Sequence, residues 1–243
     1  MTRTWSLFAV ALAATAAAAL ALPAAGKAEK GKTIMPFNGR DLTGWKFKGD
    51  KSKSKWVVGR AVLDEKDPSK LAVTVIPPQA DGGPAARQMI NPSRGVDIYT
   101  EEKFGDCLIE VEFMIPKGSN SGVYVMGEYE VQILDSYGKK QIGPGDMGGL
   151  YNTAAPKVNA CKKPGEWQTF VIDFQAPRFK DGKKTANAKF LKVTLNGEVI
   201  HENVEMKGPT PSALTGKEAP TGPLMFQGDH GPVAFRTIKI TPK

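Results

Sequence analysis

The sequence predicts an all-β protein, an antiparallel sandwich of two sheets in a single domain. Apolar and polar residues alternate with the two-residue period of β-strands in many short segments. Gly (26) and Pro (18) are frequent between those segments, and no window has the period of an amphipathic helix. A chain of 243 residues can bury a sizeable core in such a fold.

The first 25 residues have the pattern of a secretory signal peptide. One Arg precedes an Ala- and Leu-rich run over residues 5–22, and small residues follow it, so cleavage is expected near Ala21 or Ala25. The alternative is an uncleaved membrane anchor, since the run is just long enough to span a bilayer. A polar linker (26–33) and one sandwich domain (34–243) follow. We expect a secreted or periplasmic protein without a membrane span in the mature chain.

Strand periodicity is clear at residues 108–115, where Val111 and Phe113 face the core opposite Glu110 and Glu112. Residues 190–195 form a similar strand, and Asn196-Gly197 then predicts a hairpin turn. Further strands are expected at 55–58, 61–63, 71–76, 122–126, 129–134, 167–174, 224–227 and 233–240. The residues expected between the sheets are Val111, Phe113, Val131, Ile133, Val193, Leu195, Val233 and Phe235.

Composition excludes several classes of function. Two Cys and two His rule out a disulfide-rich scaffold, a Cys-based zinc site and a multi-His metal centre. The net charge of +8 comes from Lys residues spread through loops, without a basic stripe interleaved with aromatic residues, so no nucleic-acid partner is expected. No cofactor is expected. A structural Ca²⁺ stays open, although no Asp-rich loop motif is present.

The two cysteines leave one question open. Cys107 shares the apolar face of its strand, which predicts a buried thiol, whereas Cys161 lies in a polar segment. Export would permit a disulfide between them. Sequence alone does not establish that their Cα atoms lie within bridging distance.

Three polar clusters fall on or beside strand faces that point away from the predicted core. The first contains Asn120 and Tyr124, and the second contains Glu130, Gln132 and, beyond them, Asp135. The third runs from Gln227 to His230 and continues to Arg236, opposite Val233 and Phe235. Each cluster alone is also typical of a turn or a solvated strand face. Together they predict one ligand cleft on the free, concave face of a jelly-roll sheet.

An ordered set of motifs resembles the 3-keto-disaccharide hydrolase family. The matching segments are Phe37-Asn38-Gly39-Arg40-Asp41-Leu42-Thr43-Gly44-Trp45, Phe104-Gly105-Asp106, Glu110-Val111-Glu112-Phe113, Asn120-Ser121-Gly122-Val123-Tyr124, Tyr129-Glu130-Val131-Gln132-Ile133-Leu134-Asp135, Gly149-Leu150-Tyr151, Pro164-Gly165-Glu166-Trp167, Leu195-Asn196-Gly197, Phe226-Gln227-Gly228-Asp229-His230-Gly231 and Phe235-Arg236. The resemblance covers roughly residues 34–241. The chain departs from the family pattern at Met126, Gly228 and Thr237.

This resemblance implies a concanavalin A/laminin G-like jelly roll and an exported hydrolase that acts on 3-keto glycosides or 3-keto disaccharides. A ketone at C3 of a sugar acidifies the C2 proton, so the C1 substituent can leave by elimination and water can then add. Such a reaction needs a base, an acid and an oxyanion donor. We assign His230 and Glu130 to acid–base roles and Arg236 to the oxyanion. Substrate hydroxyls are expected to bind Gln132, Asn120, Tyr124, Tyr151, Asp135 and Gln227.

Two other functions fit parts of the same pattern. The segment from Glu130 to Asp135 has the outline of a glycosidase strand motif, but Gln132 stands where that motif has an acid, and a two-carboxylate mechanism needs two acids. A lectin-like carbohydrate-binding module would share the fold without needing acid–base groups. A further alternative is that Glu130 and Arg236 merely form a cross-strand ion pair on a solvated sheet.

Overall fold

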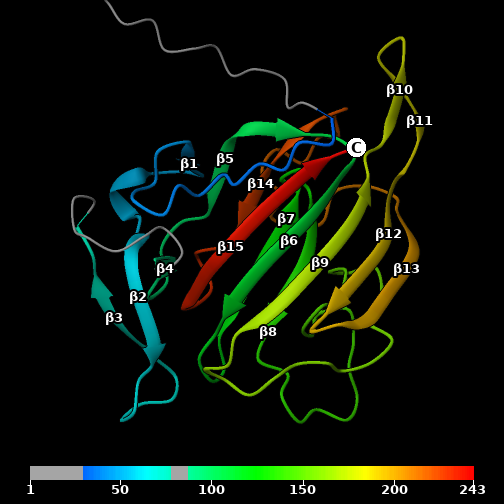
Figure 1. The fold of residues 1–243 in the computed structure, drawn as a ribbon. Helices are drawn as coiled ribbons and strands as arrows, with labels where there is room; N and C mark the ends of the chain where they lie inside the picture. Colours follow the sequence, from blue (N-terminus) through cyan, green and yellow to red (C-terminus); the bar gives the residue numbers. More distant parts are fainter. Residues whose placement is uncertain (1–29, 78–86) are drawn as a thin grey trace, which may run out of the picture.

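Two antiparallel sheets pack face to face in the computed structural model, which describes residues 30–77 and 87–243 (Figure 1). This is the predicted all-β, jelly-roll class of fold. Within the described residues the helical segment is one 3₁₀ turn, Lys51–Lys53, capped by the Asp50 side chain. The short elements follow from the frequent Gly and Pro residues, which end each strand after a few positions.

The smaller sheet, which positions the candidate site, has five strands. Their spatial order is β1 (Trp45–Phe47), β5 (Ile98–Phe104), β14 (Gly222–Phe226), β7 (Asn120–Val125) and β8 (Tyr129–Leu134). The strand β8 is therefore at an edge. Beyond that edge the backbone of Gly149 accepts a hydrogen bond from Gln132 at 2.8 Å, so the 148–151 segment continues the sheet.

The larger sheet has eight strands. Their order is β13 (Glu198–Met206), β12 (Ala188–Leu195), β9 (Gln168–Gln175), β6 (Cys107–Met114), β15 (Val233–Pro242), β4 (Gln88–Asn91), β2 (Val57–Leu63) and β3 (Leu71–Val75). A separate hairpin, β10 (Arg178–Lys180) and β11 (Lys183–Ala186), projects away from the sandwich in Figure 1.

The core lies between the sheets and consists of the side chains that the alternation predicts. All eight residues expected there are fully buried in one apolar cluster. The rings of Phe226 on β14 and Phe235 on β15 stack with centroids 3.9 Å apart, which joins the two sheets directly. Aromatic pairs of this kind add stability beyond the area that they bury.

Some strands differ from the sequence-based expectation. The strand β2 is continuous where two short strands, 55–58 and 61–63, are predicted. The predicted strands do not include β1, β4, β5, β10, β11 or β13. In β5, Glu101, Glu102 and Lys103 obscure an alternation that buries Ile98, Thr100 and Phe104. Charged residues on an exposed strand segment remove the apolar signal without preventing backbone pairing.

The predicted signal peptide lies outside the described residues. The described part of the predicted linker is not detached from the sandwich. The Gly31 amide donates to the Pro242 carbonyl at 2.7 Å, and the Ile34 amide donates to the Ile240 carbonyl at 2.8 Å. The folded domain therefore begins before residue 34, along β15. Across residues 30–77 and 87–243, no helix has the length and apolar character needed to cross a membrane.

Both cysteines are free and buried, so the disulfide that the sequence left open is not formed. The prediction of a buried Cys107 is confirmed. Burial raises the pKa of the Cys107 thiol to about 12, which makes it a poor nucleophile at neutral pH.

Candidate active site

The polar face of β7 and β8 is turned away from the other sheet, as the alternation predicts. Tyr124 pairs with Glu130 across the two strands, and Gly122 pairs with Gln132. The amide of Tyr151 donates to the Glu130 carbonyl at 3.1 Å and so places Tyr151 just beyond the sheet edge. This face is covered rather than open to solvent, since Glu130 and Gln132 are both buried.

A small cavity of about 80 Å³ opens on this face. Its lining residues are Asn120, Tyr124, Glu130, Gln132, Tyr151, Pro211, Ser212, Gln227 and His230. The fold thus brings together most of the predicted site residues, from β7, β8, the 148–151 segment and the turn after β14. The exceptions are Asp135 and Arg236.

Glu130 is the buried acid of the cavity, with 2% of its surface exposed. Its carboxyl lies over Gly122, where a Cβ atom would stand 2.2 Å from Glu130 Oε1, so only glycine leaves room for it. Burial raises the pKa of Glu130 to about 8, and the nearby carboxylates of Asp97 and Asp229 act in the same direction. The Tyr124 hydroxyl, hydrogen-bonded to this carboxyl, opposes the increase in pKa. Glu130 is therefore mainly protonated at neutral pH.

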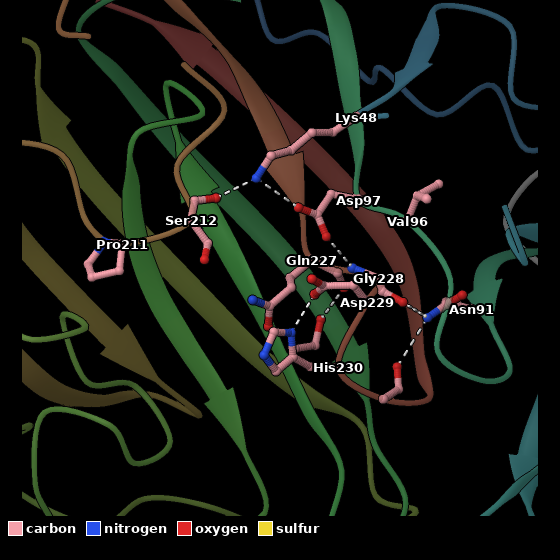
Figure 2. Close-up of polar contacts among 12 residues, drawn as sticks. Lys48, Asn91, Val96, Asp97, Pro211, Ser212, Gln227, Gly228, Asp229 and His230 are labelled. Atoms are coloured by element: carbon pink, nitrogen blue, oxygen red, sulfur yellow. Dashed lines mark hydrogen bonds and ion pairs between the residues drawn. The ribbon is translucent and has the colours of Figure 1, made fainter. Parts of the chain in front are cut away.

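The turn that carries His230 is fixed by hydrogen bonds on several sides (Figure 2). The Asn91 side-chain amide donates to the carbonyls of Gly228 at 2.8 Å and Gly231 at 3.1 Å. The Gly228 amide donates to Asp97 Oδ1 at 2.9 Å. A Cβ at position 228 would stand 2.3 Å from the Val96 carbonyl oxygen, so this departure from the family pattern is sterically required here.

His230 Nδ1 is paired with the carboxylate of Asp229 (Figure 2). Asp229 therefore orients the ring and leaves Nε2 as the nitrogen that can exchange a proton with a ligand. The His230 side chain is 46% exposed, whereas Glu130 is buried. The cavity thus has an accessible acid–base group at its mouth and a protonated carboxyl in its wall.

Three amide side chains complete the cavity. Asn120 Oδ1 and Gln227 Oε1 are buried and have no hydrogen-bond partner among the described residues. Gln132 Oε1 accepts from the Ile133 amide at 3.1 Å, which leaves its NH₂ group free to donate. Buried polar atoms in proteins are nearly always paired, so these two acceptors are available to a hydrogen-bond donor in the cavity.

Asp135 does not reach the cavity. Its Oδ2 accepts from the Gly118 amide at 2.8 Å, and its Oδ1 accepts from the Tyr137 amide at 3.3 Å. Its carboxylate therefore holds the turns on either side of β7 and β8. The prediction that Asp135 contributes to substrate binding is not supported by this geometry.

Arg236 also lies elsewhere, and the prediction that it joins the cleft is wrong. Its guanidinium pairs with Glu112 at 3.2 Å and stacks on Trp167, 4.0 Å from the ring centroid. Alternation correctly places Arg236 opposite the core, but β15 belongs to the larger sheet, whose outer face points away from the cavity. The alternative ion pair between Glu130 and Arg236 is excluded by the same placement.

The sequence analysis did not include several residues around the cavity. Lys48 Nζ lies 3.3 Å from Asp97 Oδ2 and donates to the Ser212 carbonyl at 2.6 Å (Figure 2). Asp97 is buried, and this burial raises its pKa. The role of Asp229 could have been predicted from its position next to His230 in the sequence. Lys48, Asp97 and Ser212 lie in loops far apart in sequence, and no pattern connects them.

Metal-ligating side chains do not cluster in the part of the chain that the structure describes. No group of three or more His, Cys, Asp or Glu side chains there has an arrangement suited to a metal ion.

Comparison with known proteins identifies the family of this chain. The model of the 3-keto-alpha-glucoside-1,2-lyase-like domain family matches residues 32–241. The chain belongs to this family. The resemblance to 3-keto-disaccharide hydrolases is thereby confirmed. The matched residues of this chain include every element that contributes to the cavity.

Solved structures show the same fold. A candidate glycosyl hydrolase from Parabacteroides distasonis is 28% identical, with a TM-score of 0.64 over 87% of this chain and 84% of that one. A second candidate glycosyl hydrolase from the same organism is 20% identical, with a TM-score of 0.57 over 87% and 94% of the two chains, and supports the fold alone. Comparison with curated proteins finds no match.

Proposed function

We propose that this protein is a carbohydrate-active enzyme that cleaves 3-keto glycosides by elimination across C1 and C2. The observation that carries the proposal is that one cavity holds a buried carboxyl and an accessible imidazole. Glu130 is held protonated by burial, while the Asp229–His230 pair presents a nitrogen able to accept a proton. Family membership and the candidate glycosyl hydrolase of similar fold support a sugar substrate.

The reaction balances without an added oxidant or reductant. A base removes the proton from C2, which the adjacent C3 ketone acidifies, and the electron pair of the C–H bond forms an enolate. The enolate collapses to a C1–C2 double bond as the bond from C1 to the leaving oxygen breaks. An acid protonates that oxygen, so the products are an unsaturated 3-keto sugar and an alcohol. Addition of water across the double bond completes a net hydrolysis.

We assign His230 to the base, because Asp229 holds Nδ1 and stabilises the cation that forms when Nε2 takes a proton. Glu130 is assigned to the acid, since its proton is retained to about pH 8. A positioned acid or base typically contributes about 10²–10⁴ in rate. The elimination returns one proton to the leaving group for each proton taken from C2.

Gln132 takes the oxyanion role that the sequence analysis gave to Arg236. Its carbonyl oxygen accepts from the Ile133 amide, so its NH₂ group remains to donate to a molecule in the cavity that Gln132 lines. The unpartnered acceptors of Asn120 and Gln227 would bind substrate hydroxyls. A conventional two-carboxylate glycosidase is disfavoured because Asp135, the second acid of that outline, caps a turn outside the cavity.

The decisive experiment compares a panel of 3-keto disaccharides with their unoxidised parents, using purified protein and mass spectrometry of the products. We expect turnover of the 3-keto substrates alone. His230→Ala should lower kcat at least 100-fold with little change in Tm, because the side chain is half exposed. Binding of sugars with no turnover would instead identify a lectin-like module, and equal turnover of the unoxidised parents would overturn the elimination mechanism.

A further inference from the structure

One lysine of the projecting hairpin, β10 and β11, is turned back toward the body of the protein. The side chain of Lys184 on β11 is 25% exposed, and its ammonium lies 2.6 Å from Glu218 Oε2. The same ammonium donates to the carbonyl of Lys207 at 3.3 Å. Lys207 and Glu218 lie near the two ends of the segment 207–221, which connects β13 to β14. A single ammonium therefore holds both ends of this connection together.

Glu218 joins this contact to the strand that carries Glu130. The hydroxyl of Tyr129 donates to Glu218 Oε1 at 2.6 Å, while Lys184 occupies Oε2. Tyr129 is fully buried, and its ring packs against Phe174 of β9 with centroids 5.6 Å apart. Burial raises the pKa of Tyr129, so its hydroxyl keeps the proton that it donates. Both oxygens of Glu218 thus accept charge-assisted hydrogen bonds, which are stronger than those between neutral groups.

The middle of the segment 207–221 covers Glu130. Thr210 is buried, and its Oγ1 accepts from the Glu130 amide at 3.2 Å. Pro211 and Ser212 line the cavity. These three residues carry no charge, so they act on the ionisation of Glu130 by excluding water. The titratable groups that face Glu130 come from other elements, and they are Tyr124, Tyr151, Asp97, Asp229, His230 and Lys48.

We propose that Lys184 is a positioning residue of the candidate active site, and that its ion pair with Glu218 keeps the segment 207–221 closed over Glu130. The inference rests on the proposed function only for the role of Glu130 as the acid. It also gives the hairpin a task, since β10 and β11 pair with each other and with neither sheet of the sandwich. An isolated two-stranded hairpin is marginally stable, so the same ion pair fastens the hairpin.

The test is a titration of the Glu130 carboxyl by ¹³C NMR in the wild type and in Lys184→Met. Its signal is assigned by its loss in Glu130→Gln. We expect Lys184→Met to lower the pKa of Glu130 from about 8 by about one unit, because a loosened segment admits water to the carboxyl. Loss of a positive charge by itself acts in the opposite direction, since it favours the neutral acid. The sign of the shift therefore separates hydration from a charge effect.

Lys183→Met is the matched control. Lys183 precedes Lys184 on the same hairpin, is exposed, and forms no hydrogen bond or ion pair with other described residues. We expect Lys183→Met to keep the wild-type pKa of Glu130, and Lys184→Arg to keep it as well, because Arg can still pair with Glu218. A purely structural role of Lys184 would lower Tm but leave the titration of the folded protein unaltered. An unaltered titration in Lys184→Met, or an equal fall in Lys183→Met, refutes the inference.

The titration needs no turnover, so its outcome is independent of the proposed function. If the wild type cleaves no 3-keto glycoside, the proposed function is wrong, and the titration alone still decides the role of Lys184. With an active enzyme, kcat/KM of Lys184→Met should match the wild type at pH 6 and fall about fivefold at pH 8, where less Glu130 is protonated. A shifted titration with an unshifted alkaline limb would remove Glu130 from the acid role and leave the inference about Lys184 intact.

Discussion

Glu130 lies on a strand whose two faces are both buried, and that position sets its acid–base chemistry. Val131 and Ile133 face the core between the sheets, while Glu130 and Gln132 face the covered cavity. Burial of a carboxyl without a paired cation favours its neutral form. The ammonium of Lys48 is engaged by Asp97 and Ser212 and lowers the pKa of Glu130 only in part.

The pKa of Glu130 predicts the alkaline limb of the pH–rate profile. If Glu130 acts as the acid, kcat/KM should fall above about pH 8, where its proton is lost. Glu130→Gln should lower kcat by at least 100-fold and remove that limb from the residual activity. A Glu130→Gln profile with the wild-type alkaline limb would assign the limb to another group.

The same pKa predicts how stability depends on pH. The pKa of Glu130 is raised from its ordinary value of 4.5 to about 8, so between these values the folded state holds a proton that the unfolded state lacks. The stabilising contribution of this proton is fully present below 4.5 and is lost as pH rises through about 8, by at most about 1.4 kcal/mol per pH unit. Thermal melts of the wild type and Glu130→Gln should therefore diverge from pH 5 to pH 9, with the wild type losing more Tm.

Gly122 and Glu130 should behave as a coupled pair. The three nearest atoms to a Cβ at position 122 all belong to Glu130. We therefore expect Gly122→Ala to lower stability by about 1–3 kcal/mol, and Glu130→Ala in the same chain to relieve most of that loss. Gly143→Ala is the control, because its Cβ would meet nothing closer than 3.9 Å. Additive effects of the two substitutions in denaturant unfolding would contradict the steric argument.

The segment 207–221 forms a strap over the polar face of β7 and β8. The carboxylate of Glu128 accepts from the Thr215 amide at 3.1 Å and the Gly216 amide at 3.0 Å. The Leu214 amide donates to the Gly127 carbonyl at 2.7 Å. These anchors explain how a segment without regular structure buries Glu130. The strap therefore sets the pKa that the proposed mechanism needs.

Lys48 links this strap to the His230 turn, because its ammonium contacts both Ser212 and Asp97, and Asp97 holds Gly228. We expect Lys48→Met to raise KM about tenfold, since both walls of the cavity lose a shared charge-assisted contact. Lys46→Met is the matched control, because Lys46 lies on β1, two residues before Lys48, and its ion pair with Glu101 is exposed. Steady-state kinetics with the same KM for both variants would show that the link is dispensable.

Alternation along single strands predicted most of the site but not its assembly. It gave the correct face for Glu130, Gln132 and Arg236. It carries no information on which strands become neighbours, so Arg236 was grouped with a cavity that lies on the other sheet. The contact from Lys48 to Ser212 joins residues 164 positions apart, and both lie in loops without periodicity. Such contacts depend on the packed fold and not on any local pattern.

At the scale of the whole molecule, stability and site geometry are supplied by different interactions. The sandwich core is apolar and continuous across both sheets. The turn that presents His230 is held by polar contacts, chiefly those of Asn91 with Gly228 and Gly231. A perturbation of the core far from the turn should therefore change stability while leaving the chemistry intact.

Phe190 and Asn91 allow this separation to be tested. Phe190 on β12 is fully buried against Phe174, with ring centroids 5.1 Å apart, so Phe190→Ala should lower stability by about 3–5 kcal/mol. The kcat/KM of the Phe190→Ala variant, measured at a temperature well below its Tm, should stay within about threefold of the wild-type value. The reason is that no contact of Phe190 reaches the turn. Asn91→Ala should cost only about 1–3 kcal/mol, because the Gly231 carbonyl loses the Asn91 amide while the Gly228 carbonyl keeps the Gly95 amide at 2.7 Å. It should nevertheless lower kcat/KM at least tenfold, because the His230 turn loses its position. Denaturant unfolding and steady-state kinetics on both variants measure the two effects, and a loss of activity proportional to the loss of stability in both would show that the turn has no independent support.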